Sequence, residues 1–184
     1  MAVGVPGGIP EKDRKGDDVS SDAIVMLKDD HARMRKLFRE FEQAGPRAKE
    51  TKNRIVSRIL EELTIHTYLE NEVMYPEVRR LVPDLEEDVL ESFEEHHVAD
   101  VLCMELFTMD ADDDRFDAKT TVLIESVSHH MTEEENDWFP KVREALGRKE
   151  LQDMGARMEQ LRPKAPRKPS QPSALKKAID ALVK

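Results

Sequence analysis

The sequence predicts an all-α protein: an antiparallel up-down-up-down four-helix bundle followed by an extra C-terminal helical segment and a tail. Three observations support this prediction. The 184 residues include only 7 glycines, with 39% hydrophobic and 37% charged residues, which is typical of a helix-rich globular chain. Apolar residues recur at steps of three and four along four long segments. The links between these segments are short, which favours antiparallel neighbours.

The four helices are expected in order along the chain. The first begins after the N-cap cluster at residues 20–22 and ends near residues 45–46. The second runs from about residue 47 to 75, where Pro76 disrupts or kinks it. The third spans about 84–109, and the fourth spans about 114–139 with a continuation toward 146. Their apolar stripes comprise Ile24, Leu27, His31, Met34, Phe38 and Phe41; Ile59, Leu63, His66, Glu70 and Val73; Val89, Phe93, His96, Asp100, Cys103 and Phe107; and Leu123, Val127, His130, Glu134 and Trp138.

Composition divides the chain into four parts. We expect a disordered segment at 1–19, the bundle at 20–147, a short helix at 148–161, and a basic proline-rich tail at 162–184 that ends in a short amphipathic segment. We expect the tail to be mobile or docked on the bundle.

Charge is divided unevenly between the bundle and the tail. The tail carries seven basic groups and one acidic group, a net +6, so with -10 for the whole chain the preceding residues carry -16. A domain this acidic repels nucleic acid and anionic membranes at long range, so we expect neither as a partner.

The sequence contains no sign of export or membrane insertion. No apolar run approaches the roughly 18 residues that a membrane span needs, and the N-terminal residues do not resemble a signal peptide. Cys103 is the single cysteine, which excludes an intramolecular disulfide and a thiolate-rich metal site. We expect a cytoplasmic protein, a monomer or weak homo-oligomer, with Cys103 as an inert buried thiol.

One short cassette occurs twice. His66 and Glu70 stand ten and six residues before a proline, and His130 and Glu134 stand at the same distances before another. On a helix, the two side chains of each copy leave the same face about 6 Å apart along the axis. A carboxylate and an imidazole on one stripe, presented twice, are what two facing helices need to hold two metal ions.

All six histidines fall within the four predicted helices, at positions 31, 66, 96, 97, 129 and 130. Packing the stripes together would bury imidazoles and glutamates beside one another, and buried glutamates without partners are strongly unfavourable. Metal coordination removes that cost, because the carboxylates stay ionised and the imidazoles stay neutral as ligands.

These residues resemble the hemerythrin-like, or HHE cation-binding, domain over about residues 22–146. The doubled His-x-x-x-Glu with its Tyr-Pro or Phe-Pro ending is the most specific part. The resemblance implies a four-helix bundle with a non-haem di-iron centre, in which carboxylates and an oxo or hydroxo group bridge two Fe ions. It implies terminal ligands His31, His66, His96 and His130, and bridging carboxylates Glu70 and Glu134.

Neighbouring residues leave alternatives. Matching the two cassettes favours His130 over His129, which remains an alternate. On the third helix, the residues around His96 repeat the pattern around His31, but His97 also lies on an apolar stripe and stays open. Asp100 stands where the oxygen-carrying hemerythrins have a second histidine, and it is a candidate proton handler. This departure favours redox turnover over reversible oxygen carriage.

The implied function is binding or reacting with dioxygen, hydrogen peroxide or nitric oxide, in sensing or scavenging. A catalase-like decomposition of peroxide at the di-iron centre and iron storage or handling are the alternatives. We expect Glu72, Glu133, Glu135 and Asp137 to form a solvated face, Tyr75 to pack the bundle end, and Leu63, Leu69, Val73, Val127 and Trp138 to keep the site dry.

Overall fold

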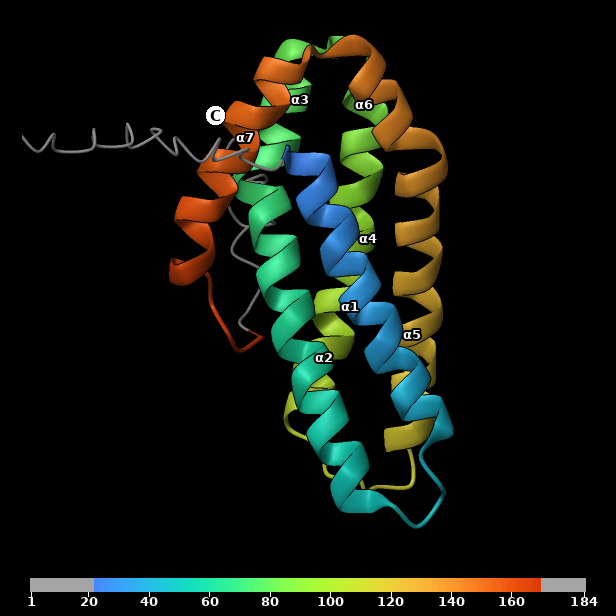
Figure 1. The fold of residues 1–184 in the computed structure, drawn as a ribbon. Coiled ribbons are helices and arrows are strands. Elements are labelled where there is room, and N and C mark those ends of the chain that lie inside the picture. Colours follow the sequence, from blue (N-terminus) through green and yellow to red (C-terminus); the bar gives the residue numbers. More distant parts are fainter. Residues whose placement is uncertain (1–21, 170–184) are drawn as a thin grey trace, which may run out of the picture.

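Four helical rods form the body of the protein (Figure 1). The computed structural model describes residues 22–169, within which no strand occurs. The predicted segment 1–19 and the amphipathic segment 174–184 lie outside the described residues. The rods are α1 (Ala23–Gln43), α2 (Lys49–Leu69) with α3 (Tyr75–Leu81), α4 (Glu86–Phe107), and α5 (Phe116–Glu133) with α6 (Phe139–Ala145).

The rods alternate in direction around a common core. α1 packs against α2 and α5, and α4 packs against the same two helices, so successive rods are neighbours. The predicted all-α bundle with short connections is therefore confirmed. A 3-10 turn at Pro83–Leu85 leads into α4. No helix within residues 22–169 combines the length and the apolarity needed to cross a membrane.

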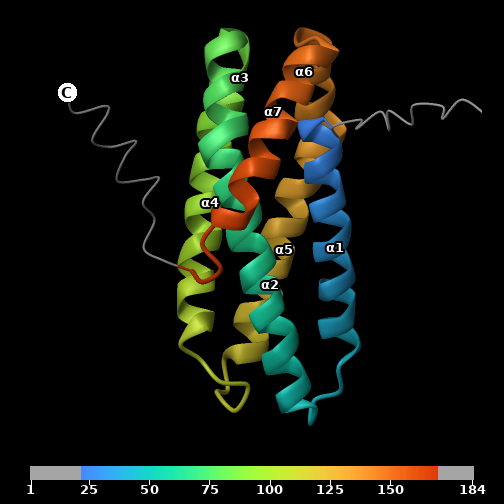
Figure 2. The ribbon, with the colours of Figure 1, turned by 60° about the vertical axis from the view of Figure 1, so that its left-hand side comes forward.

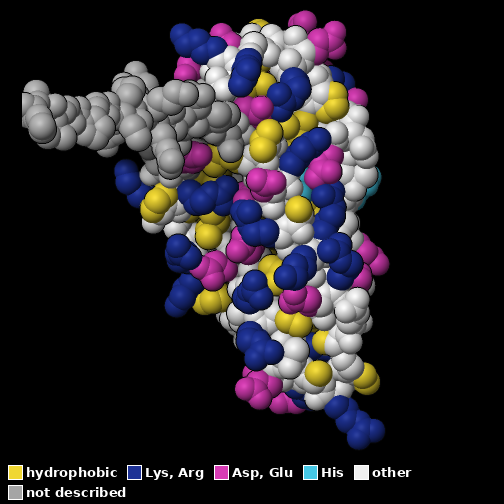
Figure 3. Space-filling view, in the orientation of Figure 1, with side chains coloured by type: hydrophobic (Ala, Val, Ile, Leu, Met, Phe, Trp, Pro, Cys, Tyr) yellow, Lys and Arg dark blue, Asp and Glu magenta, His cyan; other side chains and the backbone are white. Residues whose placement is uncertain are grey.

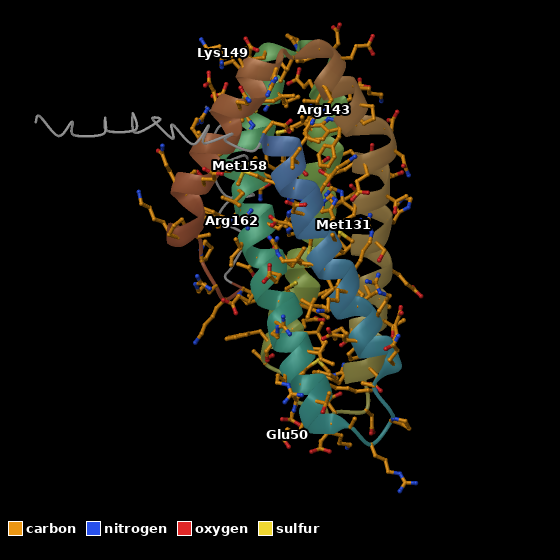
Figure 4. The ribbon with its side chains drawn as sticks, viewed as in Figure 1. Glu50, Met131, Arg143, Lys149, Met158 and Arg162 are labelled. Carbon is orange, nitrogen blue, oxygen red and sulfur yellow. The ribbon has the colours of Figure 1, made fainter. Side chains whose placement is uncertain are left out.

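α1 begins where the N-cap pattern places it. Oδ1 of Asp22 accepts a hydrogen bond from the Val25 amide at 3.0 Å, satisfying one of the free donors of the first turn. The same carboxylate pairs with Arg143 of α6, at 2.9 Å, so the first and last rods are tied at this end of the bundle (Figure 4).

A π-helical turn precedes each cassette proline. The turns span Glu70–Met74 and Glu134–Trp138, and in the first the amide of Tyr75 donates to the Glu70 carbonyl five residues back. The rod that starts at α2 does not stop near residue 75 as expected but continues through α3, because Pro76 falls in the first turn of α3, where its missing N–H is tolerated. π-turns are rare and concentrate at functional sites.

The apolar core is divided into two clusters along the bundle axis. One cluster includes Leu27, Leu69, Val73, Tyr75, Trp138 and Phe139 near the prolines. The other includes Met34, Phe38, Leu63, Cys103, Val127 and Met131 toward the opposite end. Along α1, His31 lies between Leu27 and Met34, so a polar layer separates the two clusters.

α7 (Arg148–Leu161) crosses the outside of the bundle over α1 and the π-turn that follows α2 (Figure 2). Its buried residues Leu151, Met154 and Met158 belong to the cluster near the prolines. The 3-10 turn Arg162–Lys164 then brings the first part of the tail onto the bundle, where Ala165 is buried. The face that carries α1, α2 and α7 shows Lys and Arg interspersed with Asp and Glu (Figure 3).

Candidate metal centre

Six polar side chains form the layer between the two apolar clusters. They come from all four rods, and none is more than 7% exposed: His31, His66, Glu70, His96, His130 and Glu134. The structure therefore brings together all six residues that the sequence singles out as ligands. Each glutamate is the first residue of a π-turn, so the wider turn sets where its carboxylate enters the core.

One half of the layer is formed by α1 and α2. Nε2 of His31 lies 3.2 Å from Nε2 of His66. Oε2 of Glu134 is 3.3 Å from the His31 nitrogen, and Oε2 of Glu70 is 3.1 Å from the His66 nitrogen. One ligand atom from each of these four residues lies within 4.8 Å of the others, a span that a single metal ion can bridge.

The other half is formed by α4 and α5. Nε2 of His96 lies 3.1 Å from Nε2 of His130 and 3.3 Å from Oε2 of Glu70. Oε2 of Glu134 is 3.6 Å from the His130 nitrogen. Each carboxylate thus reaches both histidine pairs, which is the placement of two bridging groups between two metal positions.

The outer nitrogens of three imidazoles face oxygen acceptors. Nδ1 of His31 donates to Oε1 of Glu135 at 2.8 Å, and Nδ1 of His130 donates to Oε2 of Glu95 at 2.7 Å. Nδ1 of His96 lies 3.1 Å from Oδ1 of Asn71. These contacts place the ring protons on Nδ1, so the Nε2 lone pairs point inward.

The inward lone pairs make the layer a fit for cations. With its proton on Nδ1, His96 presents a lone pair to Nε2 of His130 at 3.1 Å and to Oε2 of Glu70 at 3.3 Å, an arrangement that favours a positive charge between them. Both oxygens of Glu70 and Oε2 of Glu134 are buried without a hydrogen-bond partner in the described chain. Orphaned buried carboxylate oxygens are costly, and metal coordination satisfies them.

Burial and neighbouring charges shift the pKa values of these groups in different directions, and although burial lowers the pKa of His130, Glu134 with Glu95 raises it. Burial holds the pKa values of His66 and His96 well below the usual range, so both rings are neutral near pH 7. Burial, followed by the charge of Glu134, raises the pKa of Glu70 well above its usual range. Burial alone would also raise the pKa of Glu134, but His130 and His31 outweigh it and lower that pKa. In the metal-free protein, Glu134 therefore ionises at a lower pH than Glu70.

His66 lies beside a carboxylate that is itself held by two arginines. Its Nδ1 lies 3.5 Å from Oδ2 of Asp30, beyond a normal hydrogen bond. The same oxygen accepts from Arg162 at 2.8 Å, and Arg33 also pairs with Asp30. Arg162 directly follows α7 (Figure 4) and pairs with Asp30 of α1, so the segment after α7 contacts the surroundings of the layer from outside.

Tyr75 lies in the layer as well as at the bundle end. Its hydroxyl donates to Oε1 of Glu134 at 3.1 Å and is 3.2 Å from Nε2 of His96. Burial, followed by the charges of Glu134 and Glu70, raises the tyrosine pKa well above its usual range, so the phenol stays protonated and acts as a donor. The sequence favours packing at the bundle end for Tyr75 and leaves a tyrosinate ligand from Tyr68 or Tyr75 as the lesser alternative; the structure has Tyr75 in the layer as a protonated hydrogen-bond donor.

The residues that the sequence left as alternative ligands or near neighbours of the site lie outside the six-residue layer. His97 is partly buried outside the layer, so the structure brings His96 and not His97 to the centre. Asp100 is also outside it, and burial raises its pKa to about 6. His129 is exposed on α5, 3.3 Å from Glu133. Glu135 was expected on a solvated face, but it lies within the π-turn Glu134–Trp138 and is partly buried, where it contacts His31 and Arg35 of α1.

The surroundings of the layer are apolar and narrow. The apolar residues that were expected to exclude water from the site are all buried: Leu63, Leu69, Val73, Val127 and Trp138. A cavity of about 10 Å³ adjoins the layer and is lined by His66, Glu95, His96 and His130 among others. This is room for about one water-sized group. A larger hollow of about 310 Å³ lies near Phe41 and Asp117, away from the six side chains.

Comparisons with known proteins agree with this arrangement. A family model described as the hemerythrin HHE cation binding domain matches residues 22–142. Among curated proteins, none matches the chain. The crystal structure of a hemerythrin HHE cation binding domain-containing protein from Mycobacterium kansasii is similar, with a TM-score of 0.65 and 23% sequence identity over 78% of this chain and 89% of that chain. At this identity the likeness shows the fold.

Proposed function

Since the chain belongs to the hemerythrin HHE cation-binding domain family, we propose that its polar layer holds two iron ions and reacts with dioxygen, hydrogen peroxide or nitric oxide. His31 and His66 would be terminal ligands of one ion, and His96 and His130 of the other. Glu70 and Glu134 would bridge the two.

The observation that carries this proposal is the pair of buried carboxylates between two histidine pairs whose Nε2 atoms converge. Imidazole and carboxylate donors suit iron, and the layer contains no thiolate that would favour a softer ion. The near-equivalent halves, built from two copies of one cassette, favour two ions rather than one.

Two ferrous ions would supply one electron each to an oxygen species, or a binding position for nitric oxide. The protein's own part is to hold and shield them. Glu135, Glu95 and Asn71 fix the ring orientation of His31, His130 and His96, as outer partners of metal ligands commonly do.

Two features of the surroundings favour a small reactant. The Tyr75 hydroxyl, kept protonated, can donate a hydrogen bond beside Glu134. The cavity next to the imidazoles has room for a group of about water size, which favours a small reactant over an organic substrate. A sensing or scavenging role in the cytoplasm belongs to the same proposal.

The test is anaerobic loading with ferrous iron, metal analysis, and optical spectroscopy on exposure to dioxygen, then peroxide, then nitric oxide. We expect two buried irons per chain and a change in the visible spectrum with at least one reactant. Glu134→Ala should bind at most one iron tightly. Asp137→Ala removes an exposed carboxylate from the same π-turn and should behave as the wild type.

The outcomes separate the alternatives. Oxygen evolution from peroxide, lost in Glu134→Ala, would indicate catalase-like turnover, and a stable adduct without turnover would indicate sensing. More than two irons per chain with ready release to a chelator would indicate storage. Failure of the wild type to retain any iron would refute the di-iron proposal.

A further inference from the structure

A second cluster of potential metal ligands lies on the surface of α4 and α5. It consists of Glu95, His129 and Glu133, and one ligand atom from each lies within 4.8 Å of the others. His129 and Glu133 are four residues apart on α5, with 69% and 55% of their side chains exposed, and Glu95 reaches them from α4. Two helices therefore present an imidazole and two carboxylates to one point.

No lysine or arginine of the described residues offsets the negative charge of this cluster. Within residues 22–169, neither Glu95 nor Glu133 pairs with a lysine or an arginine. Each carboxylate has an imidazole as its partner, His130 for Glu95 at 2.7 Å and His129 for Glu133 at 3.3 Å, and a divalent ion between the two carboxylates would offset their mutual repulsion. Imidazole with carboxylate is a donor set that suits first-row divalent metals such as Fe²⁺ and Zn²⁺.

Glu95 connects this surface cluster to the buried layer. Its Oε2 is 2.7 Å from Nδ1 of His130. It also lines the small cavity whose other walls include His66, His96 and His130. A metal ion held by Glu95 at the surface is thus one side chain away from the imidazoles of the centre.

The other carboxylates behind the imidazoles offer no comparable approach for a cation. Glu135, behind His31, is paired with Arg35 at 2.7 Å. Asp30, behind His66, is paired with Arg162 and Arg33. Guanidinium groups at these positions occupy the carboxylates and repel an incoming divalent ion. In the part of the chain that the structure describes, no guanidinium group pairs with Glu95.

We propose that Glu95, His129 and Glu133 form a third divalent-cation site, which captures Fe²⁺ at the surface and passes it along Glu95 to the buried pair. The delivery step rests on the proposed di-iron function. The surface site does not, because its three ligands lie outside the layer.

The experiment combines equilibrium binding with loading kinetics. Calorimetric titration with Co²⁺ should give three ions per chain in the wild type and two in His129→Ala and in Glu133→Gln. Under anaerobic conditions, the same two variants should still take two Fe²⁺ into the buried layer but at least about tenfold more slowly, as loss of local cation capture implies. Uptake is followed by withdrawal of iron from a coloured chelator.

Glu94→Gln is the matched control, since it removes the same charge from an exposed position on α4 outside the cluster. It should keep three Co²⁺ ions and the wild-type loading rate. Two ions only in the wild type, or loading by His129→Ala at the wild-type rate, would overturn the proposal. In Glu70→Ala the surface ion should persist while the buried ions are lost, so failure of the surface site is distinguishable from failure of the di-iron centre.

Discussion

Replacing Asp30 by asparagine tests whether the buried centre depends on the segment that follows α7. Asp30 is 2% exposed and lies 3.5 Å from the outer nitrogen of His66, and it accepts from Arg162 at 2.8 Å. Asparagine keeps the shape of the side chain but removes its charge. Arg162 and Arg33 then lose their shared anion, and the ring of His66 loses its carboxylate neighbour.

The expected loss of stability depends on how far Asp30, Arg33 and Arg162 are shielded from water. A hydrogen bond to a charged group contributes about 1.5–3 kcal/mol. The Arg33 and Arg162 side chains are 49% and 30% exposed, so water screens part of the loss. We therefore expect the free energy of unfolding to fall by about 2–3 kcal/mol, a loss of roughly 4–12 °C in Tm for a chain of this size. Metal affinity at the His31–His66 half should fall by an amount near the lower end of about 10–100-fold, because Asp30 lies beside His66 without hydrogen-bonding it.

Asp29→Asn is the matched control, because the neighbouring carboxylate is exposed on the same helix. Urea unfolding of the metal-free proteins gives the stability difference, and competition with a chromophoric chelator gives the affinity of each of the two metal positions. If Asp30→Asn and Asp29→Asn unfold at the same urea concentration and bind both ions equally tightly, Asp30 does not support His66 and the reasoning is wrong.

Three further substitutions test other parts of the structure. Tyr75→Phe leaves Glu134 without its phenol donor, so metal-free protein should lose about 1–2 kcal/mol in denaturant unfolding, and an unchanged midpoint would contradict this. Burial raises the pKa of Asp100 to about 6 in the folded protein, above its value of about 4 in the unfolded chain. The free energy of unfolding therefore falls as the pH rises from about 4 to above 6, where Asp100 loses its proton. Asp100→Asn should stabilise by about 1–2 kcal/mol at pH 7.5 and not at pH 4, measured as the difference in unfolding midpoint at the two pH values. Asp22→Ala removes both the α1 cap and the pair with Arg143, so it should cost about 1–2 kcal/mol and more than Arg143→Ala; equal midpoints would show that the cap contributes nothing.

The centre was predictable from the sequence where its ligands repeat at fixed spacing. The cassette gives His66 with Glu70 and His130 with Glu134 because a helix converts a spacing of four into a shared face. The residues that lie beside the outer nitrogens of the imidazoles were not predictable from such a spacing. Asp30 and Arg162 are far apart in the chain, and only packing of α7 on α1 brings them together.

The sequence by itself determined the four rods, their stripes and the doubled pair of ligands, because periodicity fixes which residues share a face of one helix. Tertiary structure alone decided between His96 and His97, which point about 100° apart around the same axis, so that the rotation of α4 in the bundle selects one. It also decided that Glu135 contacts His31 and that Tyr75 joins the layer, since Glu135 lies within one π-turn and Tyr75 directly follows the other, and a π-turn departs from the regular helical spacing that the sequence pattern assumes.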